Sequence, residues 1–173
     1  MDAPATARLF VALWPDDALR RLLAEQAGHW EWPRSARLVA PENLHLTLHF
    51  LGSQPRGCIA KIDRLLWQVP SRPFELVLQA ANVWHRGVAV LEPLEMPREL
   101  TDLHAALGAG LHRIGIAPER RPWLPHVTLA RRARGAEPSA VGLPLRWYAE
   151  GAVLVESHDG YHVVSSNHPR SEP

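Results

Sequence analysis

The sequence carries one four-residue pattern twice, His-x-Thr-Leu, as HLTL at residues 45–48 and HVTL at residues 126–129. Each copy lies in an apolar run that is typical of a β-strand. Because side chains i and i+2 of a strand point to the same face, each copy directs one imidazole and one hydroxyl into the same space. If the two strands lie side by side, two imidazoles and two hydroxyls surround one small cavity. Such a set of groups is suited to acid–base chemistry on a phosphate.

Two histidines can hydrolyse a cyclic phosphodiester without a metal ion. One takes a proton from water and the other protonates the departing oxygen, from opposite sides of phosphorus, since attack and departure are roughly in line. The unperturbed pKa of imidazole, about 6.5, lies near working pH, so one ring can be neutral while the other is charged. We therefore expect His45 and His126 to be the acid–base pair, and Thr47 and Thr128 to donate hydrogen bonds to the non-bridging oxygens. The alternative is that both copies are ordinary strands with half-buried side chains and no chemistry.

The composition narrows the class of protein. A chain of 173 residues, 46% hydrophobic and with seven Trp, suits one domain or two small, tightly packed lobes. The longest apolar runs are too short to cross a bilayer, and the first residues lack the basic start and apolar stretch of a signal peptide. The single Cys58 cannot form an internal disulfide, and no cysteine pair is present for a structural zinc site. These features predict a cytoplasmic protein that does not enter a membrane.

The net charge of +1 argues against a protein that binds polyanions over its whole surface. Its positive charge is unevenly distributed, because five arginines bracket the second motif: Arg120, Arg121, Arg131, Arg132 and Arg134. Clusters of this kind are usually solvated surface. Beside a phosphate site they would instead attract the anionic ligand.

Apolar periodicity predicts three helices and seven strands. The clearest helix spans 98–114, where apolar residues recur at helical spacing, at Leu100, Leu103, Leu107, Leu111 and Ile114. The other helices are expected at 15–28 and 56–69, and the strands at 8–14, 43–51, 74–79, 83–91 with a bend near Gly87, 126–131, 145–156 and 161–166. This order predicts an α+β fold with mostly antiparallel strands.

Each half of the chain contributes helices, strands and one copy of the motif. We therefore expect two pseudo-symmetric lobes of mostly antiparallel sheet flanked by helices, with the active-site cleft between them. Only a weak boundary is marked near the middle of the sequence. The lobes are accordingly expected to form a single bilobal domain over residues 1–167, followed by a C-terminal tail at 168–173.

The motif segments, HLTLHFLG at 45–52 and PHVTLAR at 125–131, resemble the paired signatures of the two-histidine (2H) phosphoesterase superfamily. The segments RLFVAL at 8–13 and PENL at 41–44 are similar to those flanking the signatures in its bacterial and archaeal RNA 2',3'-cyclic phosphodiesterases, also called 2'-5' RNA ligases. The resemblance covers nearly the whole chain. It implies hydrolysis of a ribose 2',3'-cyclic phosphate to a 2'-phosphomonoester without a metal or organic cofactor, with weak 2'-5' ligation as a secondary activity.

The resemblance also implies roles for individual residues. His45 corresponds to the proton donor to the leaving 3'-oxygen, and His126 to the base that activates water. Arg131 corresponds to a basic residue that contacts the nucleotide, and Phe10 to an aromatic residue near the substrate that could stack on a base. The expected partners are RNA ends or nucleotides that bear a 2',3'-cyclic phosphate, and we expect the protein to act as a monomer. The 158–160 loop is shorter than is usual in the family, so substrate contacts are not transferred to it.

Some of these assignments depend on local structure. Arg131 is an odd number of residues from His126, so in a regular strand it points away from the site and reaches a ligand only if the strand ends or bulges there. Phe10 could equally belong to the core. Three tryptophans could line a nucleotide cleft, although tryptophan is more often a core residue: Trp84, Trp123 and Trp147.

Two other functions are compatible with the sequence. The same cleft could bind an RNA end or a nucleotide without turnover. Alternatively, His45, His49 and His85 could hold a metal ion in a metallohydrolase. Against this, a strand would separate His45 and His49 by about 13 Å at ~3.3 Å per residue, too far to share one ion. His104 and His112, on the predicted long helix, are expected to lie at the surface or at its boundary.

Overall fold

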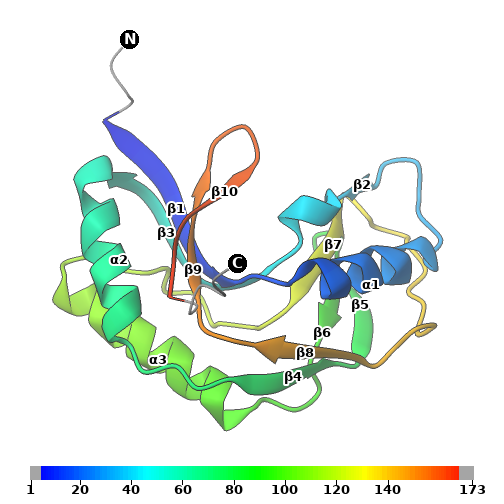
Figure 1. Ribbon diagram of the computed structural model, residues 1–173. Helices are drawn as coiled ribbons and strands as arrows, with labels where there is room; N and C mark the ends of the chain where they lie inside the picture. The colour runs from blue at the N-terminus through cyan, green and yellow to red at the C-terminus, as the bar shows by residue number, and fades with distance from the viewer. Residues whose placement is uncertain (1–4, 168–173) are drawn as a thin grey trace.

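The computed structural model describes residues 5–167, which form a large antiparallel sheet, a small two-stranded sheet and flanking helices (Figure 1). The strands are β1 (Thr6–Leu13), β2 (Arg37–Leu38), β3 (Leu46–Pro55), β4 (Phe74–Leu78), β5 (Ala80–Trp84), β6 (Val88–Glu92), β7 (Val127–Arg131), β8 (Leu145–Ala149), β9 (Val153–Ser157) and β10 (Tyr161–Ser166). The α-helices are α1 (Asp17–Gly28), α2 (Ile59–Gln68) and α3 (Arg98–Arg113), and short 3-10 helices cover Pro41–Asn43 and Arg56–Cys58. All strand pairings between these elements are antiparallel. The predicted α+β fold is confirmed.

The large sheet consists of two groups of strands that meet at β3 and β7. Its spatial order is β10-β9-β1-β3-β7-β6-β5, with β2 paired to β7. The groups are joined by a single residue pair, Leu46 with Val127. In Figure 1, α2 and α3 lie on the side of β1 and β3, whereas α1 lies on the side of β7. This is the predicted two-lobed arrangement, and the two copies of the motif lie at the junction between the lobes.

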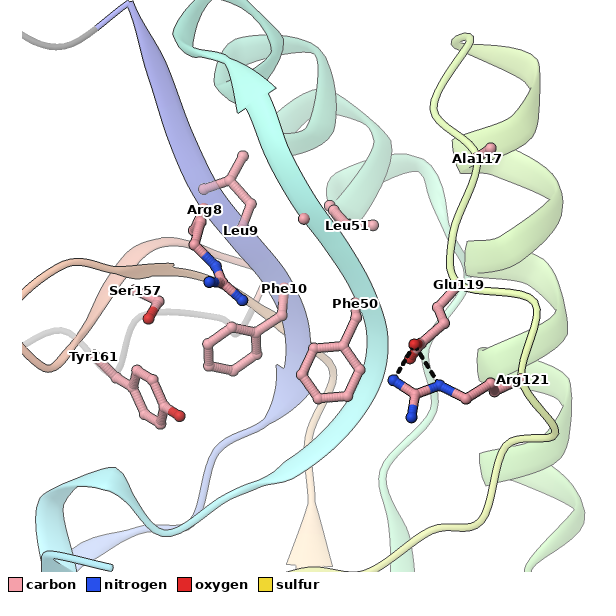
Figure 2. A pocket seen from close by; sticks show the side chains of 11 residues that line it. Arg8, Leu9, Phe10, Phe50, Leu51, Ala117, Glu119, Arg121, Ser157 and Tyr161 are labelled. Atoms are coloured by element: carbon pink, nitrogen blue, oxygen red, sulfur yellow. Dashed lines mark hydrogen bonds and ion pairs between the residues drawn. The ribbon is translucent and has the colours of Figure 1, made fainter.

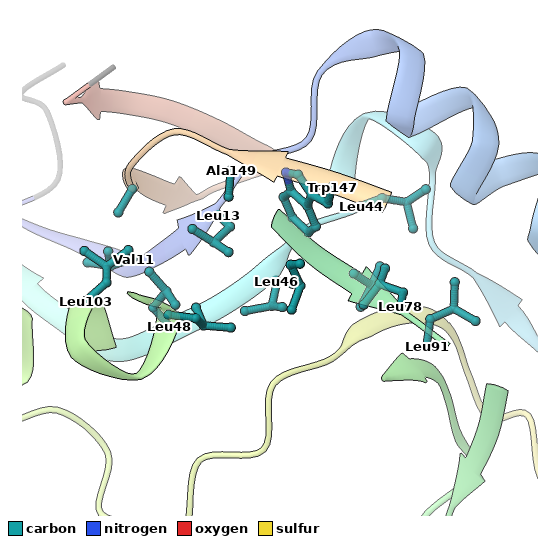
Figure 3. Packing of buried hydrophobic residues seen from close by; sticks show 14 of the residues in the cluster. Val11, Leu13, Leu44, Leu46, Leu48, Leu78, Leu91, Leu103, Trp147 and Ala149 are labelled. Atoms are coloured by element: carbon teal, nitrogen blue, oxygen red, sulfur yellow. The ribbon is translucent and has the colours of Figure 1, made fainter. Parts of the chain in front are cut away.

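The core spans this junction and contains buried residues from both groups of strands (Figure 3). Leu13 of β1, together with Leu46 and Leu48 of β3, is buried in the same cluster as Leu103 of α3 and Trp147 of β8. Burying one such leucine side chain contributes about 1.5–3 kcal/mol. Because these apolar residues fix which face of β3 is turned inward, they also fix which face is left for the motif side chains.

The helices form where the sequence predicts them. The Asp16 carboxylate caps α1 by accepting a hydrogen bond of 2.7 Å from the Leu19 backbone N–H. In α3 the residues at helical spacing are buried: Leu100, Leu103, Leu107 and Leu111. The predicted helix at 56–69 begins with a 3-10 turn over Arg56–Cys58 before α2 starts at Ile59.

Three strand predictions need correction. The segment 83–91 is a hairpin of β5 and β6, because Gly87 adopts a positive φ of 74° and closes a tight turn with the Trp84 carbonyl. The segment 145–156 is two strands, β8 and β9, which join different sheets on either side of Gly151, whose φ is 91°. The segment 43–51 begins as a 3-10 turn, so β3 starts at Leu46 and continues to Pro55.

Two expectations concern the limits of the chain. No helix within residues 5–167 combines the length and apolar character needed to cross a membrane. The predicted tail at 168–173 lies outside the described residues, and the domain boundary after residue 167 remains a prediction.

Candidate active site

The pairing of β3 with β7 places the four motif side chains on one face. Leu46 and Val127 face each other and are both fully buried in the core. Since neighbouring side chains of a strand alternate, the residues on either side of this pair point to the opposite face. His45 and His126 come directly before β3 and β7, and the charge of His126 lowers the pKa of His45, so the two imidazoles lie within electrostatic reach of each other. The pairing of β3 with β7 therefore brings the two predicted histidines to the same junction between the lobes.

The two imidazoles are held by the same backbone arrangement. His45 Nδ1 lies 2.6 Å from the Asn43 carbonyl oxygen, and His126 Nδ1 lies 2.6 Å from the Leu124 carbonyl oxygen. A carbonyl oxygen only accepts, so each Nδ1 carries the proton and donates it. In the neutral ring, Nε2 then has a free lone pair, which in His45 accepts a hydrogen bond of 3.0 Å from the Thr47 hydroxyl. Each ring is thereby oriented with its Nδ1 bound to the backbone and its Nε2 left without a backbone partner.

Aromatic side chains surround His45. Its ring centroid is 4.9 Å from that of Phe10, 5.6 Å from that of Trp14 and 5.2 Å from that of Tyr161. Burial among these rings is the main reason that the pKa of His45 is lowered to about 4, and the positive charges of His126, Arg131 and Arg20 lower it further, against the raising effect of the Asn43 carbonyl. In the free protein His45 is therefore neutral at pH 7.

His126 has a related environment on the other side of the junction. Its ring lies 4.3 Å from that of Trp84. Burial lowers the pKa of His126 and Arg131 adds to this effect, whereas the Leu124 carbonyl and the Glu92 carboxylate oppose it. Burial and the positive charge of Arg131 thus lower the pKa of both imidazoles.

A cavity of about 720 Å³, called here the larger cavity, opens beside this pair. Thr47, His126, Thr128 and Arg131 all line it. His45 adjoins it through its hydrogen bond to Thr47. The larger cavity therefore brings together one predicted acid–base histidine and three predicted substrate-binding side chains, with the second histidine beside it.

Arg131 reaches the larger cavity because β7 bulges. On β6, Val90 pairs with Thr128 and the next residue, Ala89, pairs with Ala130, so Leu129 is an extra residue in β7. The bulge shifts the alternation of side chains by one residue. Arg131 consequently shares a cavity with His126, although regular alternation would place the two on opposite faces.

The other predicted arginines are divided between the cavity and the surface. Arg121 also lines the larger cavity, where it forms an ion pair with Glu119. Arg134 lies 3.5 Å from the His85 carbonyl oxygen, and Arg120 and Arg132 are exposed. Only part of the arginine cluster is therefore placed to attract an anion into the site.

The aromatic residues that line the site are not all those that the sequence predicts. Trp84 and Trp123 line the larger cavity, whereas Trp147 is a core residue with 3% of its surface exposed. Phe10 is only 4% exposed and packs against His45, so its contact with a base remains a prediction. The exposed ring is that of Phe50, at 49%. Sequence reasoning missed Phe50, since bulges in β3 determine which way it points.

A set of stacked rings supports the wall of the larger cavity. Trp123 stacks on His104, with centroids 3.8 Å apart and planes 8° apart, and His104 stacks on His49 at 4.1 Å. The Trp123 Nε1–H donates a hydrogen bond of 3.0 Å to the Thr47 carbonyl oxygen. This bond ties the segment that precedes His126 to the strand that carries Thr47. His104 is half-buried, in agreement with the predicted boundary position.

The histidines of the metallohydrolase hypothesis do not form a cluster. His49 Nε2–H donates a hydrogen bond of 2.8 Å to the His104 carbonyl oxygen, in the contact between β3 and α3. Within residues 5–167, no group of three or more His, Cys, Asp or Glu side chains is placed to hold a metal ion. His45, His49 and His85 are thus not arranged as a set of metal ligands.

Comparisons with known proteins place the chain among phosphoesterases of one family. Residues 15–160 match the 2'-5' RNA ligase superfamily. The chain is 34% identical over 131 residues to an RNA 2',3'-cyclic phosphodiesterase of Escherichia coli (strain K12), covering 75% of this chain and 74% of that protein. A protein of the same name from Methanothermobacter thermautotrophicus is 30% identical over 130 residues, covering 72% of this chain and 70% of that one.

Solved structures show the same fold. The crystal structure of E. coli LigT in its apo form superposes with a TM-score of 0.79 at 27% identity, covering 94% of this chain and 97% of that chain. LigT complexed with 3'-AMP also gives a TM-score of 0.79 at 27% identity, covering 93% of this chain and 97% of that chain.

Proposed function

The chain belongs to the 2'-5' RNA ligase superfamily, and we propose that it hydrolyses RNA or nucleoside 2',3'-cyclic phosphates to 2'-phosphomonoesters by metal-independent general acid–base catalysis. The observation that carries this proposal is the pair of imidazoles, one from each lobe, that flank the single Leu46–Val127 pair with their Nδ1 atoms fixed by backbone carbonyls. The names of the two curated relatives support the same activity.

In the proposed reaction, His126 Nε2 takes a proton from water as its oxygen bonds to phosphorus. The bond between phosphorus and O3' breaks, and His45 Nε2 donates a proton to O3', which leaves the phosphate on O2'. Acid and base groups positioned in this way each contribute about 10²–10⁴-fold to the rate. The hydroxyls of Thr47 and Thr128 and the guanidinium of Arg131 stabilise the charge on the non-bridging oxygens.

For His45 to act as the proton donor, the negative charge of the bound substrate must raise its pKa. In the free protein the pKa of His45 is about 4, and burial and the charge of Arg131 both favour the neutral ring. A cyclic phosphodiester anion between the rings raises the pKa of each imidazole and neutralises Arg131. Protonation of His45 is therefore coupled to substrate binding.

The same geometry accounts for a weak 2'-5' ligation. If a ribose 5'-hydroxyl takes the place of water, His126 accepts its proton and the oxygen bonds to phosphorus while O3' leaves with a proton from His45. The product is a 2'-5' phosphodiester. Because water is far more concentrated than RNA ends, hydrolysis is the main reaction.

The proposal is tested with a nucleoside 2',3'-cyclic phosphate in the presence of excess chelator. We expect turnover to a 2'-phosphate, and we expect His45→Ala and His126→Ala each to lose most of the activity while His112→Ala, exposed on α3, retains it. A 3'-phosphate product or a requirement for added metal would contradict the proposal. Tight, salt-sensitive binding without product would identify a nucleotide-binding module instead.

A further inference from the structure

A second cavity, called here the smaller cavity, adjoins the larger one. It has a volume of about 460 Å³ and lies between β1, β3, the start of β10 and the segment that follows α3 (Figure 2). Phe50, Glu119 and Arg121 line both cavities and form the boundary between them. The smaller cavity is within the size range of small-ligand sites and is not needed for the chemistry at the two histidines.

We propose that the smaller cavity binds the nucleotide that precedes the terminal 2',3'-cyclic phosphate of a single-stranded RNA. The terminal nucleotide then occupies the larger cavity. This inference rests on the proposed function, because it assigns the path of the RNA chain away from the cleaved phosphate. Under this proposal an RNA end fills both cavities, whereas a mononucleotide fills only the larger one.

The aromatic side chains of the smaller cavity suit an unpaired base. Figure 2 shows the rings of Phe10, Phe50 and Tyr161 along one opening. Phe50 packs against Phe10 with ring centroids 6.2 Å apart, but it is 49% exposed, so about half of its surface is open to a ligand. Proteins recognise unpaired bases by stacking them on such aromatic faces, and this contact tolerates any base.

The charged side chains of the smaller cavity suit a phosphodiester. Arg8, on β1, is exposed, and among residues 5–167 its guanidinium has no ion-pair or hydrogen-bond partner. Arg121 and Glu119 pair with each other, as the dashed lines in Figure 2 show, and so largely cancel. Arg8 is therefore the cation available to a phosphate that links two nucleotides.

The position of His45 connects the two cavities. Tyr161, which lines the smaller cavity, packs edge-on against His45 with ring centroids 5.2 Å apart. On the other side, His126 lines the larger cavity. The RNA chain, which leaves the terminal nucleotide through its 5'-phosphate, can pass from the larger into the smaller cavity across the boundary that Phe50, Glu119 and Arg121 form.

The test compares kcat/KM for a nucleoside 2',3'-cyclic phosphate with that for a dinucleotide ending in the same cyclic phosphate. We expect the dinucleotide to be preferred by about tenfold or more, as one stacked base and one phosphate contact would provide. Arg8→Gln and Phe50→Leu should each reduce this ratio, and Phe50→Tyr, which keeps a ring, should restore it. Arg64→Gln, an exposed charge change on α2 outside both cavities, is the matched control and should leave the ratio unchanged.

Two results would overturn the inference while the proposed function stands. One is turnover of the mononucleotide with a ratio near one. The other is a large ratio that neither Arg8→Gln nor Phe50→Leu changes, which would place the second nucleotide elsewhere. If neither substrate is turned over by the wild-type protein, the proposed function itself fails. Both substituted residues are exposed, so folding, checked by circular dichroism, should be preserved.

Discussion

The two copies of the motif are alike in their backbone as well as in their residue types. In each, the imidazole Nδ1–H donates to the carbonyl of the residue two positions earlier, which leaves Nε2 for chemistry. The types and spacing of these four residues predict that they share one face, because a strand alternates its side chains. The orientations of Arg131 and Phe50 could not be predicted in this way, since single-residue bulges in β7 and β3 shift the alternation.

The hydroxyl of Thr128 gives a prediction about one hydrogen bond. It lines the larger cavity, and among residues 5–167 it has no hydrogen-bond partner, so it is available to a phosphate oxygen. Thr128→Val keeps the shape and removes the donor. Since a hydrogen bond to a charged group contributes about 1.5–3 kcal/mol, we expect kcat/KM to fall about 10- to 100-fold. Thr128→Ser should recover most of the activity, and an unchanged rate in Thr128→Val would exclude the contact.

The secondary-structure elements show where apolar patterning is informative and where it is not. The helix α3 follows from its leucine spacing, and each of these leucines is buried. The break at Gly151 is set by a positive φ angle, which the apolar pattern over residues 145–156 does not reveal, so that pattern predicts one strand. Near Gly87 the sequence predicts a bend but not the two-stranded hairpin of β5 and β6. The closeness of the two lobes depends in addition on contacts far apart in sequence, such as that of Trp123 with β3.

Trp123 is predicted to position the segment that leads into His126. Trp123→Phe removes the hydrogen bond to the Thr47 carbonyl and keeps a ring for stacking on His104. We expect kcat to fall more than KM rises, and the free energy of unfolding to fall by about 1 kcal/mol, the usual contribution of one hydrogen bond. Trp67→Phe, on an exposed tryptophan of α2, is the control and should change neither quantity. A change in stability without a change in kcat would show that Trp123 has only a structural role.

For the protein as a whole, buried neutral histidines link folding to pH. A stable core and the two-lobed α+β fold could be predicted from the sequence. The joint burial of four histidines, at the junction and at the adjoining contact between β3 and α3, could not. The pKa values of His45 and His104 are lowered to about 4, and those of His49 and His126 are lowered as well, in every case mainly by burial.

These shifts fix the sign of the pH dependence. Below pH 6.5 the unfolded chain binds protons that the folded protein does not, so the free energy of unfolding should decrease as the pH falls from about 6.5 towards 4. Above pH 6.5 both states are neutral at these residues, and the histidines should add no pH dependence. Denaturant unfolding at a series of pH values measures the slope. His104→Phe should make it shallower and His112→Gln should not, and equal slopes in all three proteins would contradict this origin.

The convergence of two imidazoles on one phosphate can be measured without turnover by following the histidine ring signals in an NMR pH titration. In the free protein the pKa of His45 should be about 4 and that of His126 below its ordinary value. Adding a nucleoside 2'-phosphate should raise both pKa values together, while the ring signals of exposed His112, the control, should not respond to the ligand. A phosphate that shifts only one of the two rings, or neither, would show that His45 and His126 do not share a site.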